Sequence, residues 1–238
     1  MLLNSGNTIG FSNKAFLRHH MGCLLHRLGA LLPRWLHGSD LVRECRELEQ
    51  RCWRELGYSQ QPVFGGDLPP FLIADADGHS ADLSNPTDPA DLADLMAALV
   101  PSPLPASSIA GMNLSALNRL LPLSLFEFQW LLWSYCIQRF GSAILPKIPL
   151  RDQQHGCEVL ALLSEMPVDA VRDAVASRRM HMWGLLDGMG SDGAMPSTLS
   201  GWLLATDQFA DWIEQPYDSD TDLLIALCQA QVSLPASR

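Results

Sequence analysis

Apolar residues recur at helical spacing near the start of the chain. Within residues 16–35 and again within residues 41–56 they fall every three or four positions, the period of one face of an α-helix. Ser39 or Asp40 precedes the second run as an N-cap, and Gly57 follows it as a stop. The pattern predicts two helices joined by a turn at residues 36–38.

Residues 58–112 have a different composition. They contain eight prolines and seven aspartates but no Lys or Arg. Within this stretch, residues 71–78 are typical of a short strand and turn, and residues 89–100 of a short acidic helix. The Pro/Ser/Ala-rich residues 101–112 predict a linker between domains.

The apolar pattern is strongest between residues 113 and 140, which predict two helices. Ser124 opens the second helix and Glu127 stands three residues later, the spacing of a capping box. This helix is apolar almost all round its circumference. We therefore expect it at the centre of a core, with Trp130 and Trp133 buried.

The remaining residues predict two helices, two strands and two further helices. The predicted helices cover residues 155–165, 167–176, 207–214 and 220–230, and the predicted strands cover residues 179–186 and 198–205, joined by a glycine-rich turn. Two helices followed by a two-stranded wing are the order of a winged helix. The sequence thus predicts a mainly α fold, with a helical N-terminal region (1–100), a linker (101–112) and a winged-helix-like α+β region within residues 113–238.

Charge is unevenly distributed. The 238 residues carry a net charge of −10, with +3 in residues 1–60 and −13 in residues 61–238. An acidic body repels nucleic-acid phosphates, so general DNA or RNA binding is disfavoured. Charged residues make up only 18% of the chain, which indicates apolar surface that meets a protein partner.

The six cysteines are far apart in sequence and form no Cys-x-x-Cys pair. We expect them to be free thiols in a reducing cytoplasm. The polar start of the chain does not resemble a signal peptide, and the most apolar stretch, residues 120–137, is interrupted by polar residues. We therefore expect a cytoplasmic protein that does not enter a membrane.

The glycines of Gly188-x-Gly190-x-x-Gly193 have the spacing of a dinucleotide-binding loop. Such a loop needs a helix directly after it, whose N-terminus receives the pyrophosphate. Pro196 and the strand-like residues 198–202 follow instead. The spacing therefore favours a hairpin turn, and we expect no cofactor here.

His20, Cys23 and His26 bring metal-ligating residue types to one predicted helix. Their spacing spreads the outer two by roughly 120° around the helix, and the sequence offers no paired ligands to complete a site. The Asp75-x-Asp77-Gly78 segment lacks the bidentate glutamate of a calcium loop. We expect no metal at either place.

The linear motifs of common enzymes are absent from the sequence. It has no Gly-x-Ser-x-Gly, no His-Glu-x-x-His and no Gly-Lys-Ser/Thr segment, the last of which a P-loop requires. We therefore expect no catalytic residue and no ATP hydrolysis by these residues. An enzyme whose catalytic residues are distant in sequence remains a third hypothesis, since such a site leaves no linear motif.

Three arginines are the candidate contacts of the predicted winged helix. Arg172 lies on its second helix, and Arg178 and Arg179 follow that helix. They are the residues that would touch DNA phosphate or a protein partner. The helix also carries two aspartates, which favours a protein partner over DNA.

Residues 114–227 resemble the region that precedes the ATPase module in large bacterial AAA+ ATPases. The matching segments are the helix opening at 123–128, the helices at 158–163 and 168–175, the segments at 183–187 and 199–204, and the helix at 207–213. In such proteins the ATPase core would begin shortly after the position of Arg238. The resemblance implies a recognition or regulatory role beside an ATPase, with no functional residue carried over.

These features favour a non-catalytic protein-interaction or regulatory module. Its expected partner is an AAA+ ring, of which the chain would be the N-terminal part or a stand-alone relative, or the target of that ring. A winged-helix transcription regulator that binds DNA is the alternative.

Overall fold

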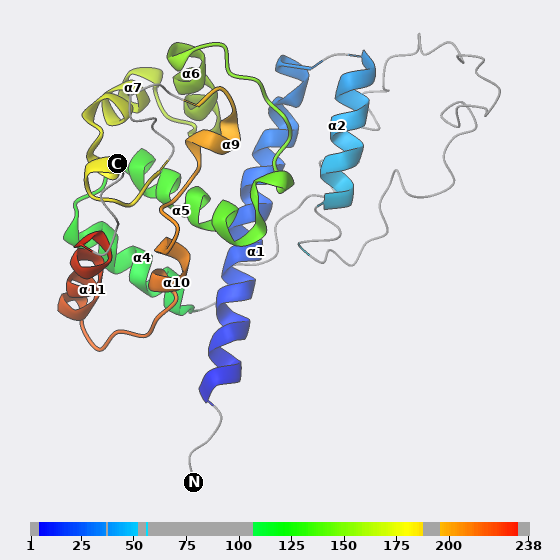
Figure 1. Ribbon diagram of the computed structural model, residues 1–238. Helices are drawn as coiled ribbons and strands as arrows, with labels where there is room; N and C mark the ends of the chain where they lie inside the picture. The colour runs from blue at the N-terminus through cyan, green and yellow to red at the C-terminus, as the bar shows by residue number, and fades with distance from the viewer. Residues whose placement is uncertain (1–4, 37, 52–55, 57–106, 188–195, 233–238) are drawn as a thin grey trace. The chain divides into compact units, whose positions relative to one another are not determined.

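The computed structural model describes residues 5–36, 38–51, 56, 107–187 and 196–232, which are mainly helical as the sequence predicts (Figure 1). The chain divides into two compact units. Unit 1 comprises Met1–Met21, Ser102–Ser142 and Ile148–Arg238, and unit 2 comprises Gly22–Pro101 and Ala143–Lys147. The sequence-based boundaries place Met1–Met21 with residues 22–100, whereas this division groups them with the C-terminal part. The strand at 71–78 and the helix at 89–100 are predicted for residues outside the described ranges.

Unit 2 contains the two N-terminal helices that the hydrophobic pattern predicts. The first, α1 (Ser5–Leu31), begins before residue 13 and has its last ten residues in this unit, followed by a 3-10 turn, η1 (Leu32–Arg34). The second is α2 (Gly38–Arg51), and η1 contacts it. Leu24 and Leu28 of α1 and Cys45 and Leu48 of α2 are buried at the predicted spacing.

Unit 1 is built around α5 (Leu125–Phe140). The predicted capping box is confirmed: Ser124 Oγ accepts from the Glu127 amide at 3.2 Å, and Glu127 Oε2 accepts from the Ser124 amide at 2.8 Å. The burial of both tryptophans is also confirmed, with Trp130 1% and Trp133 4% exposed. The Trp130 indole N–H donates to the Trp202 carbonyl at 2.7 Å, so it is buried without losing its hydrogen bond.

The helix before α5 begins inside the stretch that the sequence predicts as a linker. This helix is α4 (Ile109–Leu120), and Ser108 caps it by accepting from the Gly111 amide at 2.8 Å. An N-cap of this kind satisfies one of the free amides of the first turn. The expectation that residues 109–112 belong to a linker was therefore wrong.

Other helices of unit 1 surround α5 (Figure 1). α6 (Gln153–Ser164) packs on α7 (Val168–Ser177), and α7 contacts α5, while α10 (Phe209–Ile213) contacts both α4 and α5. Asp152 caps α6 by accepting from the His155 amide at 2.8 Å. Gly156 permits close packing here, because a Cβ at this position would lie 2.4 Å from the Trp202 ring.

The predicted strands at 179–186 and 198–205 are wrong. Residues 179–182 form one helical turn, α8 (Arg179–Met182), and residues 199–202 form another, α9 (Leu199–Trp202). α9 is helical because the Thr198 hydroxyl caps it, accepting from the Gly201 amide at 3.3 Å. α8 forms after Arg178 turns the chain with a positive φ of 54°. Among the described residues the predicted wing is reduced to an isolated bridge, Leu186 with Ala205.

No helix within the described ranges is both long and apolar enough to cross a lipid bilayer.

Candidate functional site

A groove of about 620 Å³ lies in unit 1 between α4 and the start of α11 (Asp220–Val232). These helices pack against each other, and they are the green and red helices at the lower left of Figure 1. The groove is open to solvent, and its volume is within the range of roughly 300–1,000 Å³ that is typical of binding pockets. Its lining residues are Phe16, Ser107, Ser108, Gly111, Met112, Asn113, Ser115, Ala116, Arg119, Tyr217, Asp218, Ser219, Asp220 and Leu223.

The inner end of the groove depends on a close approach of α1 to α4. The buried Asn13 side chain accepts from the Ala110 amide at 3.1 Å, which joins the two helices. A Cβ at Gly111 would lie 2.9 Å from the Phe16 ring and 2.7 Å from Ser108 Oγ. Position 111 therefore requires glycine, because the Phe16 ring and Ser108 leave no room for a larger side chain.

The opposite wall is the segment that connects α10 to α11. The Asn113 side-chain amide donates to the Ile213 carbonyl at 2.8 Å and to the Gln215 carbonyl at 2.7 Å. The Tyr217 hydroxyl donates to the Trp212 carbonyl at 3.0 Å, and burial raises the pKa of this hydroxyl. Side-chain bonds to backbone carbonyls thus fix this wall without a bound partner.

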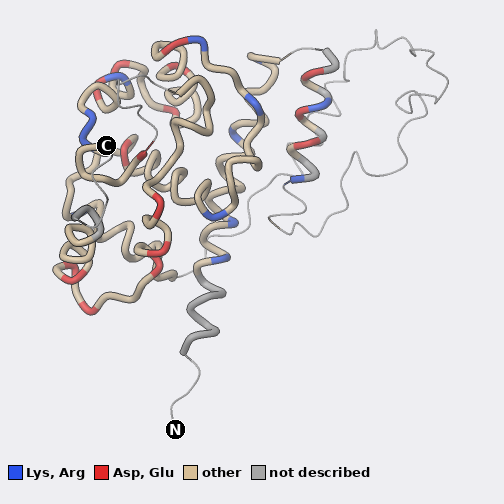
Figure 2. The backbone as a smooth tube through the Cα atoms, in the orientation of Figure 1, with Lys and Arg blue, Asp and Glu red and all other residues tan. Residues whose placement is uncertain are grey.

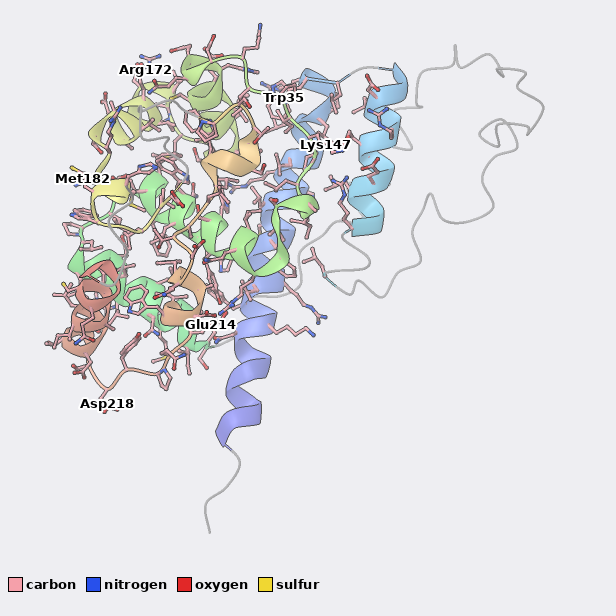
Figure 3. All side chains as sticks on the ribbon, in the orientation of Figure 1. Trp35, Lys147, Arg172, Met182, Glu214 and Asp218 are labelled. Carbon is pink, nitrogen blue, oxygen red and sulfur yellow. The ribbon has the colours of Figure 1, made fainter. Side chains whose placement is uncertain are left out.

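The rim of the groove is charged. Arg119 pairs with Asp220 at 3.0 Å, and both side chains are about half exposed (63% and 49%). Ser219 caps α11, because its hydroxyl accepts from the Asp222 amide at 3.2 Å and donates to the Asp222 carboxylate at 2.7 Å. Asp218 is exposed on the preceding loop (Figure 3) and forms no ion pair within the described part of the chain.

The groove also exposes apolar surface. The Met112 side chain is 64% exposed, although it lies on α4 beside the buried Ala116. Methionine is flexible and polarizable and adapts to different partner shapes. The described residues that line the groove include no His, Cys or Lys, and they suit binding by shape, apolar contact and charge.

The three arginines that the sequence proposes as contacts lie elsewhere in unit 1. Arg172, which Figure 3 labels, pairs with Asp169 on the same helix at 2.8 Å and donates to Gln154 at 3.1 Å. Arg179 pairs with the buried Glu127. Arg178 is exposed and makes no ion pair with a described residue. The three arginines therefore share no common contact among the described residues.

Glu127 forms a buried charge contact that the sequence did not predict. Its carboxylate is 1% exposed and accepts from Arg179 Nε at 3.1 Å and Nη2 at 2.5 Å. Burial alone would raise the pKa of Glu127, but the hydrogen bonds from Arg179 and Ser124 outweigh it and lower this pKa. The Arg179 guanidinium also lies 5.3 Å from the Trp183 ring centre. The contact holds α8 against the start of α5.

A second polar cluster connects α5 to α10. Tyr135 donates to Glu214 at 2.7 Å, and Arg139 pairs with Glu214 at 2.9 Å and with Asp211 at 2.7 Å. Burial, followed by the neighbouring Glu214, raises the pKa of Tyr135. Because these groups satisfy one another, we assign the cluster to helix packing.

The remaining sequence candidates give no site within the described ranges. There, no group of three or more His, Cys, Asp or Glu side chains could hold a metal ion. Burial and the neighbouring His19 lower the pKa of His20 to about 4, and its ring packs on Phe16. The five described cysteines are free thiols. The glycine motif at 188–193 and the aspartates at 75–82 lie outside the described residues.

Sequence interpretation missed the groove because it assigned residues 101–112 to a linker. The sequence of α4 did contain a pattern that indicates the groove. Met112, Ser115 and Arg119 share one helix face there, at spacings of three and four residues. The Ser219-x-x-Asp222 spacing also indicated where α11 begins. That these two helices come together could not be inferred from local patterns.

No protein-family model, no curated protein and no solved structure matches the chain.

Proposed function

We propose that this protein is a non-catalytic interaction module that binds a segment of a partner protein in the groove between α4 and α11. The observation that carries the proposal is the groove itself, a pocket of about 620 Å³ that places an exposed methionine beside charged side chains. A mixture of apolar contact and a few placed polar groups is what such binding requires.

The groove walls are fixed in advance, which favours binding. Asn13 joins α1 to α4, and Asn113 anchors the loop before α11 by two hydrogen bonds. Binding to a preorganised surface avoids the entropy cost of ordering it. A short partner segment can therefore reach useful affinity with only a few contacts.

We further propose that the partner is a bacterial AAA+ ATPase ring, of which the chain is the N-terminal part or a separate companion, or a target of that ring, in the cytoplasm. The resemblance of residues 114–227 to the region before the ATPase module supports this. The resembling region includes residues 114–120 of α4 and 220–227 of α11, although none of the matching segments lies in either helix.

The direct test begins with peptides selected from a random displayed library on the full chain. Their affinities are then measured by fluorescence anisotropy against the wild-type chain and two variants. Met112→Gln removes apolar surface from the groove, whereas Met182→Gln is the matched control, because Met182 is 69% exposed and lies outside the groove (Figure 3). We expect Met112→Gln to weaken binding about fivefold to tenfold and Met182→Gln to leave it unchanged.

Two outcomes would overturn the proposal. One is a selection that yields no saturable binder. The other is a loss of affinity that is equal in the two methionine variants, because the peptides would then bind outside the groove.

DNA binding, the alternative function, gains no support from the charges of α7 and α8. Arg172 and Arg179 are paired with carboxylates of the chain itself, and α7 also exposes Asp169 and Asp173. We expect no shift of duplex DNA at low micromolar protein and physiological salt. A salt-sensitive shift that Arg178→Ala abolishes would favour the transcription regulator instead. Arg178 is suited to this test because its removal breaks no ion pair with a described residue.

A further inference from the structure

We propose that the groove selects a cationic partner segment, with Lys or Arg next to one or two apolar side chains. This inference rests on the proposed function, because it specifies what the same groove binds. It follows from the charges around the groove and from the position of its apolar surface.

Carboxylates outnumber cations at the groove. Among its described lining residues, Asp218 and Asp220 stand with one cation, Arg119. Residues 207–222 include the groove wall between α10 and α11. They contain six Asp or Glu and no Lys or Arg. Figure 2 shows these acidic residues following one another along α10 and the loop to α11.

Internal interactions account for most of these carboxylates, but Asp207 and Asp218 make no ion pair with a described residue, and of these two only Asp218 lines the groove. Arg139 pairs with Asp211 and Glu214. Asp220 and Asp222 lie in the first turn of α11, where negative charge stabilises the helix dipole. Asp218 precedes the helix and makes no ion pair with any described residue, so its charge is available to a ligand.

The Arg119–Asp220 pair can exchange its partner at low cost. Both side chains are about half exposed, and an ion pair exposed to solvent contributes little to stability. A partner guanidinium or ammonium that enters the groove can therefore bind Asp218 and compete for Asp220. An acidic segment could compete for Arg119 in the same way, but it would then face both Asp218 and the released Asp220.

Apolar contacts complete the recognition. Phe16 and Met112 line the same groove as the two aspartates. A cationic side chain has a long aliphatic stem that packs on such surface while its charged end reaches a carboxylate. Lys and Arg therefore satisfy both parts of the groove.

The test uses three fluorescein-labelled peptides of about 12 residues that share the same leucines. Their remaining positions carry Arg, Gln or Glu. We expect the Arg peptide to bind most tightly and the Glu peptide most weakly. The affinity of the Arg peptide should fall at least about fivefold between about 50 and 300 mM NaCl, because salt screens exposed charges.

A matched pair of variants separates a local effect from net charge. Asp218→Asn removes a carboxylate from the groove, and Asp173→Asn removes one from the exposed surface of α7. We expect Asp218→Asn to weaken the Arg peptide about twofold to fivefold, and Asp173→Asn to have no effect. The Gln peptide should bind both variants as it binds the wild type.

The possible failures are distinct. If the Arg and Gln peptides bind equally well and both are weakened by Met112→Gln, the groove binds peptides but the cationic preference is wrong. If Asp173→Asn and Asp218→Asn weaken the Arg peptide equally, the preference is a net-charge effect and the inference also fails. If no peptide binds, including peptides selected from the random library, the proposed function itself fails.

Discussion

Removing Arg179 from the Glu127–Arg179 ion pair should lower the free energy of unfolding more than removing the charge of Glu127. Glu127 is 1% exposed, whereas Arg179 is 39% exposed. In Arg179→Met, the carboxylate stays buried without its cation. In Glu127→Gln, the freed guanidinium can turn to solvent, and the glutamine still accepts from the Ser124 amide.

The magnitudes follow from this asymmetry. Leaving one buried charge unpaired costs about 3–5 kcal/mol, and we expect about 3 kcal/mol for Arg179→Met, because one side of the pair is already hydrated. Glu127→Gln should cost about 1 kcal/mol, the value of an ordinary hydrogen bond. The double variant should resemble Glu127→Gln, which gives a coupling energy of about 2–3 kcal/mol.

Denaturant unfolding followed by tryptophan fluorescence measures these values, since five of the seven tryptophans belong to unit 1. The pKa of Glu127 is lowered in the folded protein, so its contribution is complete above the ordinary value of 4.5 and is lost as the pH falls through the folded-state pKa. Equal costs for the two single variants, or a double variant whose cost is their sum, would refute this reasoning.

Three further predictions concern the core and the pH dependence of stability. Trp133→Ala should lower the free energy of unfolding by about 3–5 kcal/mol, because Trp133 is 4% exposed; a loss below 1 kcal/mol in denaturant unfolding would contradict its burial. Gly156→Val should lower the melting temperature, since its Cβ would overlap the Trp202 ring, whereas an unchanged calorimetric transition would show that the ring is not so close. The pKa of His20 is lowered from 6.5 to about 4 by burial and by His19, so stability should decrease as the pH falls below 6.5, by at most about 1.4 kcal/mol per pH unit. His20→Gln should remove that part of the slope, and an unchanged slope would mean that His20 is hydrated.

The sequence predicted the helices with local signals well. α5 was recognised because Ser124 and Glu127 form a capping box and because the helix is apolar almost all round. α7 and α11 were placed within one or two residues of their observed ends. Helical spacing and caps are local properties of a few neighbouring residues, so they can be recognised without a fold.

Interactions between distant residues explain what the sequence missed. The segments at 179–186 and 198–205 were predicted as strands, but the Arg179–Glu127 pair and the Thr198 cap favour single helical turns. Glu127 looked like a capping residue alone, because its second partner lies 52 residues away. The groove was missed for the same reason, since it forms where α4 meets a helix that follows about 100 residues later.

Protection of Met112 from oxidation tests the central claim most directly. Peroxide converts exposed methionine to the sulfoxide, and mass spectrometry follows Met112 and Met182 in one sample, both of them exposed in the free chain (64% and 69%). We predict that saturating Arg peptide slows the oxidation of Met112 at least about fivefold and leaves the rate at Met182 unchanged. Equal oxidation rates at Met112 with and without bound peptide would contradict the assignment of the groove as the binding site.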